Sequence, residues 1–96
     1  MANYKISNAA KEDLIRIHQY GVSKFGTKQA DKYFNSLFDY FDIIARRPFS
    51  FEAVDFIKPG YRRCVCGVDS IYYKISDNTV EIMSIIGRQD LNQLQQ

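Results

Sequence analysis

The sequence predicts an α+β fold in which an N-terminal strand leads into an antiparallel helical hairpin packed on one face of a C-terminal antiparallel sheet. Two observations support this prediction. Apolar residues recur at helical spacing in the first half of the chain and at a spacing of two in the second half. At 96 residues the chain has room for one domain, so we expect residues 1–96 to form a single domain, with residues 87–96 as a polar tail.

The N-terminal part predicts a short strand and then a helix. Tyr4 and Ile6 alternate about a polar residue, which is typical of a strand, and Ser7 is placed to cap the helix that follows. Gly26 is placed to end that helix. The predicted apolar stripe of this helix recurs at spacings of four, three and four and consists of Ala10, Leu14, Ile17 and Gly21.

A second helix is predicted from Thr27, its expected cap, to Arg46 and Arg47, where Pro48 stops it. It has two apolar stripes, which suit contact with both a sheet and a neighbouring helix. The join between the helices is short, so they should form an antiparallel hairpin. The two stripes are Ala30, Tyr33, Leu37, Tyr40 or Phe41 and Ile44, and beside them Phe34, Phe38, Phe41 and Ala45.

The second half of the chain predicts four strands in immediate succession, at residues 53–57, 61–66, 70–75 and 80–86. Turn signals at Pro59-Gly60, at residues 67–69 and at Asp77-Asn78 separate them. Strands that follow one another so closely form an antiparallel meander. After them, the tail has only Leu91 and Leu94 as apolar anchors.

The last two predicted strands have apolar residues on both faces, although helices would cover only one. Strict alternation leaves three apolar side chains on the uncovered face: Tyr72, Met83 and Ile85. Either loops or the tail cover them, or they form a partner surface with Arg62 and Lys74 as a basic rim.

The thiols and the histidine predict no catalytic or metal site, and we expect no cofactor. Cys64 and Cys66 lie on one face of one strand, which makes a disulfide between them awkward, so we expect both to be buried structural residues. Without a second cysteine pair they cannot complete a tetrahedral metal shell. His18 falls beside the stripe of the first helix, where a boundary position is expected.

The basic residues are the only cluster with possible binding chemistry. Arg62 and Arg63 are adjacent on a predicted strand, so they should point to opposite faces. Lys58, one of these arginines and Arg88 either converge on a phosphate or stay solvated at strand edges.

The overall charge and hydropathy exclude two classes of function. Thirteen basic and eleven acidic residues give a net charge of +2, which is too weak for a dedicated nucleic-acid binder. No apolar run approaches the roughly 18–20 residues of a membrane span. The N-terminus has no pattern of a signal peptide, so we expect a cytoplasmic protein that binds no membrane.

Several local motifs follow one another in a specific order. They are Ile6-Ser7 with Ala10, Asp13-Leu14, Ile17 and Tyr20; Phe25-Gly26 with Gln29-Ala30 and Tyr33; Ala45-Arg46-Arg47-Pro48; Pro59-Gly60-Tyr61-Arg62-Arg63; Ile71-Tyr72-Tyr73-Lys74-Ile75; and Val80-Glu81-Ile82 with Ile85-Ile86. With these motifs the chain resembles, over residues 4–90, the ParE toxins of the RelE/ParE superfamily of bacterial toxin–antitoxin systems.

The resemblance implies the same fold but leaves two activities to separate. ParE-type members poison DNA gyrase without catalysis, whereas RelE-type relatives are ribosome-dependent mRNA endonucleases that use basic residues and a C-terminal Tyr or His. Residues 50–58 contain one lysine and two acids, and neither Tyr nor His follows Arg88. The groups that would move protons in RNA cleavage are therefore missing, which favours the gyrase poison. The alternatives are a RelE-type endoribonuclease, or an inactive relative that acts only as antitoxin partner and co-repressor.

The resemblance also implies partners. A ParD-type antitoxin is expected to neutralise the toxin and to carry the contact with operator DNA. The expected antitoxin contacts are Arg62, Arg63, Tyr72, Met83 and Ile85. The expected gyrase contacts lie in the tail, at Arg88, Leu91 and Leu94.

Overall fold

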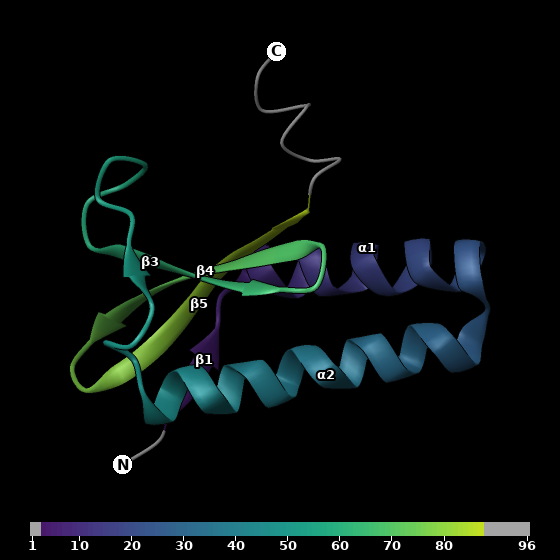
Figure 1. Ribbon diagram of the computed structural model, residues 1–96, viewed down its shortest axis with the longest axis horizontal. Coiled ribbons are helices and arrows are strands. Elements are labelled where there is room, and N and C mark those ends of the chain that lie inside the picture. The colour runs from purple at the N-terminus through teal and green to yellow at the C-terminus, as the bar shows by residue number, and fades with distance from the viewer. Residues whose placement is uncertain (1–2, 88–96) are drawn as a thin grey trace.

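A computed structural model describes residues 3–87 and has two helices packed on a five-stranded sheet (Figure 1). This confirms the predicted fold class. Along the chain the elements are β1 (Tyr4–Ile6), α1 (Asn8–Phe25), α2 (Thr27–Arg46), β2 (Glu52–Ala53), β3 (Tyr61–Cys66), β4 (Asp69–Ser76) and β5 (Thr79–Gly87). The strand order is β1-β5-β4-β3-β2, in which β1 runs parallel to β5 and the other pairs are antiparallel.

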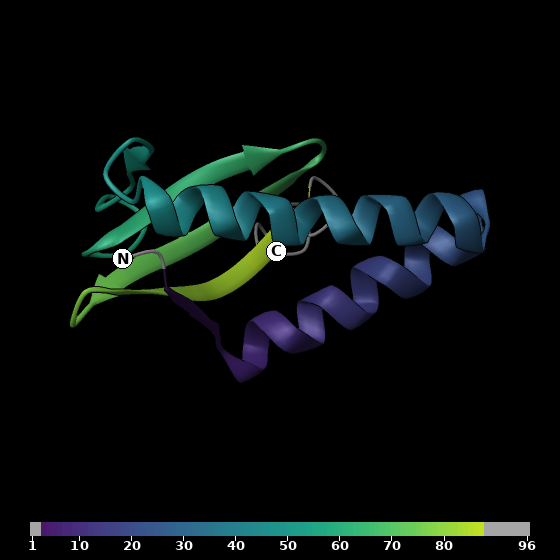
Figure 2. The same ribbon diagram turned by 90° about the horizontal axis from the view of Figure 1, so that it is seen from below.

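The two helices meet at one end and diverge toward the sheet, so that their connected ends project beyond it (Figure 2). Ser7 caps α1 as predicted, because its Oγ accepts the backbone N–H of Ala10 at 3.1 Å. Gly26 ends α1 at φ 87°, a left-handed conformation that favours glycine. The predicted cap at Thr27 is wrong: Thr27 is already helical, and Gly26 also serves as the N-cap of α2, without a side-chain bond.

The core lies between the helical hairpin and the sheet. The predicted stripe residues Ala10, Leu14 and Ile17 are buried, as are Leu37 and Ile44 on α2. Phe41 joins the two layers, because its ring is fully buried and lies 5.6 Å from the ring of Tyr4 on β1 and 5.2 Å from that of Phe38. A thin core of this kind depends on a few large side chains.

The four predicted strands occur, but the first is much shorter than expected. Only Glu52–Ala53 pairs with β3, and the expected strand from 53 to 57 is wrong after its first residue. The carbonyl of Val54 accepts the N–H groups of Ile57 and Lys58 at 2.8 and 3.1 Å, which turns the chain instead of extending it. The turn at Asp77 and Asn78 is as predicted, since both residues have positive φ, as a two-residue hairpin turn requires.

A β-bulge in β5 overturns the predicted assignment of faces. Tyr72 pairs with Ser84 while Tyr73 pairs with Ile82, so Met83 is an extra residue in β5. Beyond it the alternation shifts by one, and Ile85 turns onto the helix-covered face beside Ile71, fully buried. The prediction that Ile85 lies on the uncovered face is therefore wrong, because strict alternation holds only for a strand without an inserted residue.

Candidate functional site

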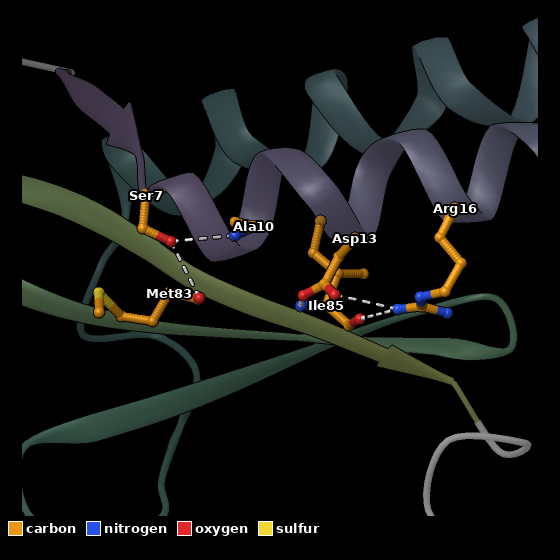
Figure 3. A network of polar contacts seen from close by, with 6 residues as sticks. All are labelled: Ser7, Ala10, Asp13, Arg16, Met83 and Ile85. Carbon is orange, nitrogen blue, oxygen red and sulfur yellow. Dashed lines mark hydrogen bonds and ion pairs between the residues drawn. The ribbon is translucent and has the colours of Figure 1, made fainter.

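Polar side chains of α1 hold the bulge in place (Figure 3). The Ser7 hydroxyl that caps α1 also donates to the carbonyl of Met83 at 3.0 Å. The Asp13 carboxylate accepts the backbone N–H of Ile85 at 3.0 Å. Arg16 donates to the carbonyl of Ile85 at 3.3 Å and to the Asp13 carboxylate at 3.1 Å.

These bonds satisfy backbone groups along the part of the β5 edge that no strand pairs. Strand β1 pairs with β5 only at residues 80–82. Beyond that point the side chains of Ser7, Asp13 and Arg16 bond the backbone groups of Met83 and Ile85 on the open edge of β5. An edge satisfied in this way is protected from pairing with another chain.

Two of the five expected antitoxin contacts are buried. Ile85 is fully enclosed, and the side chain of Tyr72, although outside the main core, is only 6% exposed. Tyr72 lies between its cross-strand neighbours Arg63 and Ser84. Met83 is half-buried at the bulge. The expected exposed trio of Tyr72, Met83 and Ile85 therefore does not exist as one surface.

The two arginines lie on opposite faces of β3, as predicted. Arg63 forms an ion pair with Glu52, with Nε donating to the carboxylate at 2.7 Å. Hydrogen bonding to Tyr72, and then to Glu52, raises the pKa of Arg63 above its usual value. Arg62, on the helix side, donates to the carbonyl of Phe51 at 2.7 Å and packs over the ring of Phe49 at 5.1 Å.

The loop between α2 and β2 presents an aromatic side chain that the sequence analysis did not single out. Phe49 is 71% exposed, although the chain is fixed on both sides of it. The hydroxyl of the buried Tyr73 donates to the carbonyl of Pro48 at 2.7 Å, and Arg62 donates to that of Phe51. The exposure of Phe49 could not be predicted from the sequence, because an aromatic residue after α2 suits a core position equally well.

A groove runs beside Phe49 at the end of the molecule where α2 ends and β4 turns into β5. Its volume is about 860 Å³. Its walls include apolar residues, Arg46 and the β4–β5 turn. The lining residues are Asn3, Ala45, Arg46, Pro48, Phe49, Ile75, Asp77, Asn78, Thr79 and Val80. We call Phe49, Arg62 and this groove the Phe49 surface.

The proposed phosphate cluster is not assembled by the residues that the structure describes. Lys58 lies 5.5 Å from the ring of Tyr61, and Arg62 packs on Phe49. Arg88, the third expected member, lies outside residues 3–87, as do Leu91 and Leu94.

His18 occupies the boundary position expected for it, between the two helices. Its Nε2 lies 2.6 Å from the carboxylate of Asp31 on α2, and its ring meets the edge of Phe34 at 5.3 Å. This pair joins α1 to α2. Within residues 3–87, no group of three or more His, Cys, Asp or Glu side chains is placed to hold a metal ion.

A polar pair between a half-buried tyrosine and a buried aspartate was not predicted from the sequence. The hydroxyl of Tyr33 on α2 lies 2.5 Å from the carboxylate of Asp69 and 3.0 Å from the carbonyl of Cys66. Burial, and then the contact with Asp69, raises the pKa of Tyr33. The carboxylate of Asp69 also lies against Gly87, where a Cβ would come within 2.6 Å of Oδ1. No periodicity or spacing links these positions, which lie far apart in the sequence.

Both cysteines are free and buried, as predicted, and burial raises the pKa of each thiol to about 11. The folded state therefore holds these protons more tightly than the unfolded chain, in which a thiol has a pKa of about 8.5. The resulting stabilisation is complete below that pH and is lost as the pH rises toward 11. We expect the midpoint of thermal unfolding to fall across this interval, and to fall less in a Cys64→Ala/Cys66→Ala variant.

The same burial predicts slow chemical modification. At about pH 8 both thiols should react with iodoacetamide much more slowly in the folded protein than in the chain unfolded by about 8 M urea. Equal rates in the two states would contradict the buried position of Cys64 and Cys66.

Neither helix in the described part of the chain is long and apolar enough to cross a membrane. Solved structures share its fold. A chain of the structure described as a chromosomal ParDE toxin–antitoxin system from P. aeruginosa superposes with a TM-score of 0.80 at 18% identity, over 91% of this chain and 96% of that one. A chain of the toxin–antitoxin complex RelBE2 from Mycobacterium tuberculosis gives 0.69 at 16% identity, over 91% and 98%.

Sequence comparisons agree with the fold. The toxin ParE1 of Caulobacter vibrioides is 32% identical over 92 residues, which are 96% of this chain and 94% of that protein. Toxin ParE1 of Mycobacterium tuberculosis is 28% identical over 86 residues, 88% of each chain. A family model described as "ParE toxin of type II toxin-antitoxin system, parDE" matches residues 4–91. The match takes in every strand and both helices, and the chain therefore belongs to the ParE family of toxins from type II toxin–antitoxin systems.

Proposed function

We propose that this protein is a non-enzymatic poison of DNA gyrase, which traps the enzyme with cleaved DNA and so blocks replication in the cytoplasm. The observation that carries the proposal is the match to the ParE family from residue 4 to residue 91. We infer a single domain over residues 1–96, with Arg88, Leu91 and Leu94 as candidate gyrase contacts.

The geometry around Arg62 supports this proposal over RNA cleavage. Its guanidinium donates to the carbonyl of Phe51 and packs on Phe49. Some of its hydrogen-bonding capacity is therefore used within the protein to fix the loop between α2 and β2. An arginine stabilises charge but does not readily exchange protons at neutral pH. The only histidine of the sequence, His18, pairs with Asp31 on the helical hairpin, not on the sheet that carries Arg62.

We further propose that a ParD-type antitoxin neutralises the toxin and mediates any contact with operator DNA. The superposed P. aeruginosa chain belongs to a structure described as a ParDE toxin–antitoxin system, which supports such a partner. Of the contacts expected from the sequence, Arg62, Arg63 and Met83 retain partial exposure and stay candidates, whereas Tyr72 and Ile85 are enclosed.

A gyrase assay tests the proposal. Purified toxin is added to gyrase, relaxed plasmid and ATP, and the DNA is analysed after denaturation of the enzyme. We expect supercoiling to be lost and linear, cleaved plasmid to accumulate, and the cognate antitoxin, mixed in first, to prevent both effects. As a control, the same toxin preparation is added to a translation reaction with intact ribosomes.

The other outcomes separate the alternatives. Normal supercoiling together with mRNA cut at the ribosomal A site would replace the gyrase poison with a RelE-type endoribonuclease. No effect in either reaction, with tight antitoxin binding retained, would identify an inactive relative that serves as antitoxin partner and co-repressor.

A further inference from the structure

The exposed ring of Phe49 lies on a backbone segment that is anchored on both sides. Tyr73 bonds the carbonyl of Pro48, the residue before it, and Arg62 bonds that of Phe51, two residues after it, at 2.7 Å each. Arg62 also packs on the ring. An aromatic side chain that stays in water while its backbone is fixed loses little conformational entropy when a partner covers it. Aromatic anchors of this kind are common at the centres of interfaces.

Positive charge is concentrated in the segment of the sequence that contains this loop. Residues 46–63 contain five cations and two carboxylates, a net charge of +3, so the rest of the chain sums to −1. Two of these cations are neutralised, since Arg46 pairs with Asp42 and Arg63 with Glu52. Arg47, Lys58 and Arg62 form no ion pair within residues 3–87. A partner of complementary charge is therefore acidic.

We propose that the Phe49 surface is a docking site for an acidic segment of the antitoxin. In this arrangement an apolar side chain of the segment enters the groove beside Phe49 and Ile75, and a neighbouring carboxylate bonds Arg62 or Arg47. The proposal rests on the proposed function for the existence of the antitoxin, and it adds the place and the chemistry of the contact.

The groove favours a peptide over a nucleic acid. Its walls include the apolar side chains of Ala45, Pro48 and Ile75, which suit an aliphatic or aromatic residue. The acidic residue Asp77 also lines it and brings a carboxylate to this end of the molecule. A phosphate backbone brings a charge at every nucleotide and would meet this carboxylate, whereas a peptide can place single carboxylates beside the arginines alone.

The test measures the affinity and association rate of the full-length toxin for its full-length cognate antitoxin. We expect Phe49→Ala to weaken binding by about tenfold or more, mainly through faster dissociation. Arg47→Glu should slow association several-fold at a low salt concentration of about 50 mM NaCl. It should also reduce the dependence of the association rate on salt.

Two matched variants control for general effects. Phe25→Ala removes an aromatic ring that is 68% exposed at the far end of the helical hairpin. Lys24→Glu reverses a charge in the last turn of α1, as Arg47→Glu does at the end of α2, and so disturbs a helix dipole in the same way. We expect both to bind the antitoxin within about twofold of the unchanged protein, and circular dichroism to show that all four variants are folded.

Three results would overturn the inference. In the first, Phe49→Ala and Arg47→Glu bind the antitoxin as tightly as the controls do. In the second, they bind it normally but lose gyrase inhibition, which would assign the surface to the target enzyme. In the third, only binding to a single-stranded DNA oligonucleotide is lost, which would assign it to nucleic acid. Failure of the proposed function is seen separately, because the unchanged toxin would then leave gyrase active whatever its affinity for the antitoxin.

Discussion

Replacing Phe41 with alanine is expected to lower the free energy of unfolding by about 3–5 kcal/mol. Its ring is fully buried and contacts Tyr4 on β1 as well as Phe38 on its own helix. The change removes apolar surface and leaves a cavity between the two layers, which the surrounding side chains fill only in part. Since a domain of this size has a stability of only about 5–15 kcal/mol, the loss is a large fraction of the total.

Urea unfolding followed by circular dichroism measures this effect. Phe25→Ala is the control, because the same truncation at a side chain that is 68% exposed should change the stability by at most about 0.5 kcal/mol. A loss below about 1 kcal/mol for Phe41→Ala would mean that the contact between α2 and β1 adds little to the fold.

Asp13→Ala is expected to destabilise the protein by about 1–3 kcal/mol, because it leaves the backbone N–H of Ile85 without its carboxylate acceptor. It also removes the partner of Arg16, which bonds the carbonyl of the same residue. The amide of Ile85 should then exchange its hydrogen faster, while amides in the middle of α2 change only as far as global stability does.

Glu12→Ala is the matched control for Asp13→Ala, since it removes an exposed carboxylate from the neighbouring position of α1. It should alter stability by less than about 0.5 kcal/mol. Asp13→Asn, which keeps an oxygen acceptor, should recover part of the loss. If Asp13→Ala were as stable as Glu12→Ala, the Asp13 carboxylate would contribute nothing to holding the bulge.

The helices could be predicted because their signals are local. The stripe of Ala10, Leu14 and Ile17, the cap at Ser7 and the glycine at 26 each act within a few residues, and the structure places all of them as expected. The same holds for the turn at Asp77-Asn78. The extent of β2 was overestimated because the turn at Val54 depends on backbone hydrogen bonds that composition does not reveal.

The candidate surfaces were harder to predict, because they depend on contacts between distant segments. The faces of β5 reverse at Met83, and the side chains that fix this reversal come from α1, about seventy residues earlier in the chain. Phe49 was not singled out, since its position depends on the bonds that Tyr73 and Arg62 make to the carbonyls of Pro48 and Phe51, and both donors come from other segments of the chain. The opposite orientation of Arg62 and Arg63 was correct, because it needs only the alternation of a regular strand.

The inserted residue in β5 sets a constraint on how this part of the chain can vary. Ile82 and Ile85 are both core residues although they are three positions apart, an odd spacing for a strand. Deleting Met83 would make the strand regular and would leave Ser84 and Ile85 opposite the same residues of β4, Tyr72 and Ile71. It would, however, remove the carbonyl that accepts the Ser7 hydroxyl and change the backbone that places the N–H of Ile85 against Asp13. Substitutions at Met83 keep the backbone carbonyl that Ser7 bonds, so they should be better tolerated than deletion of this residue.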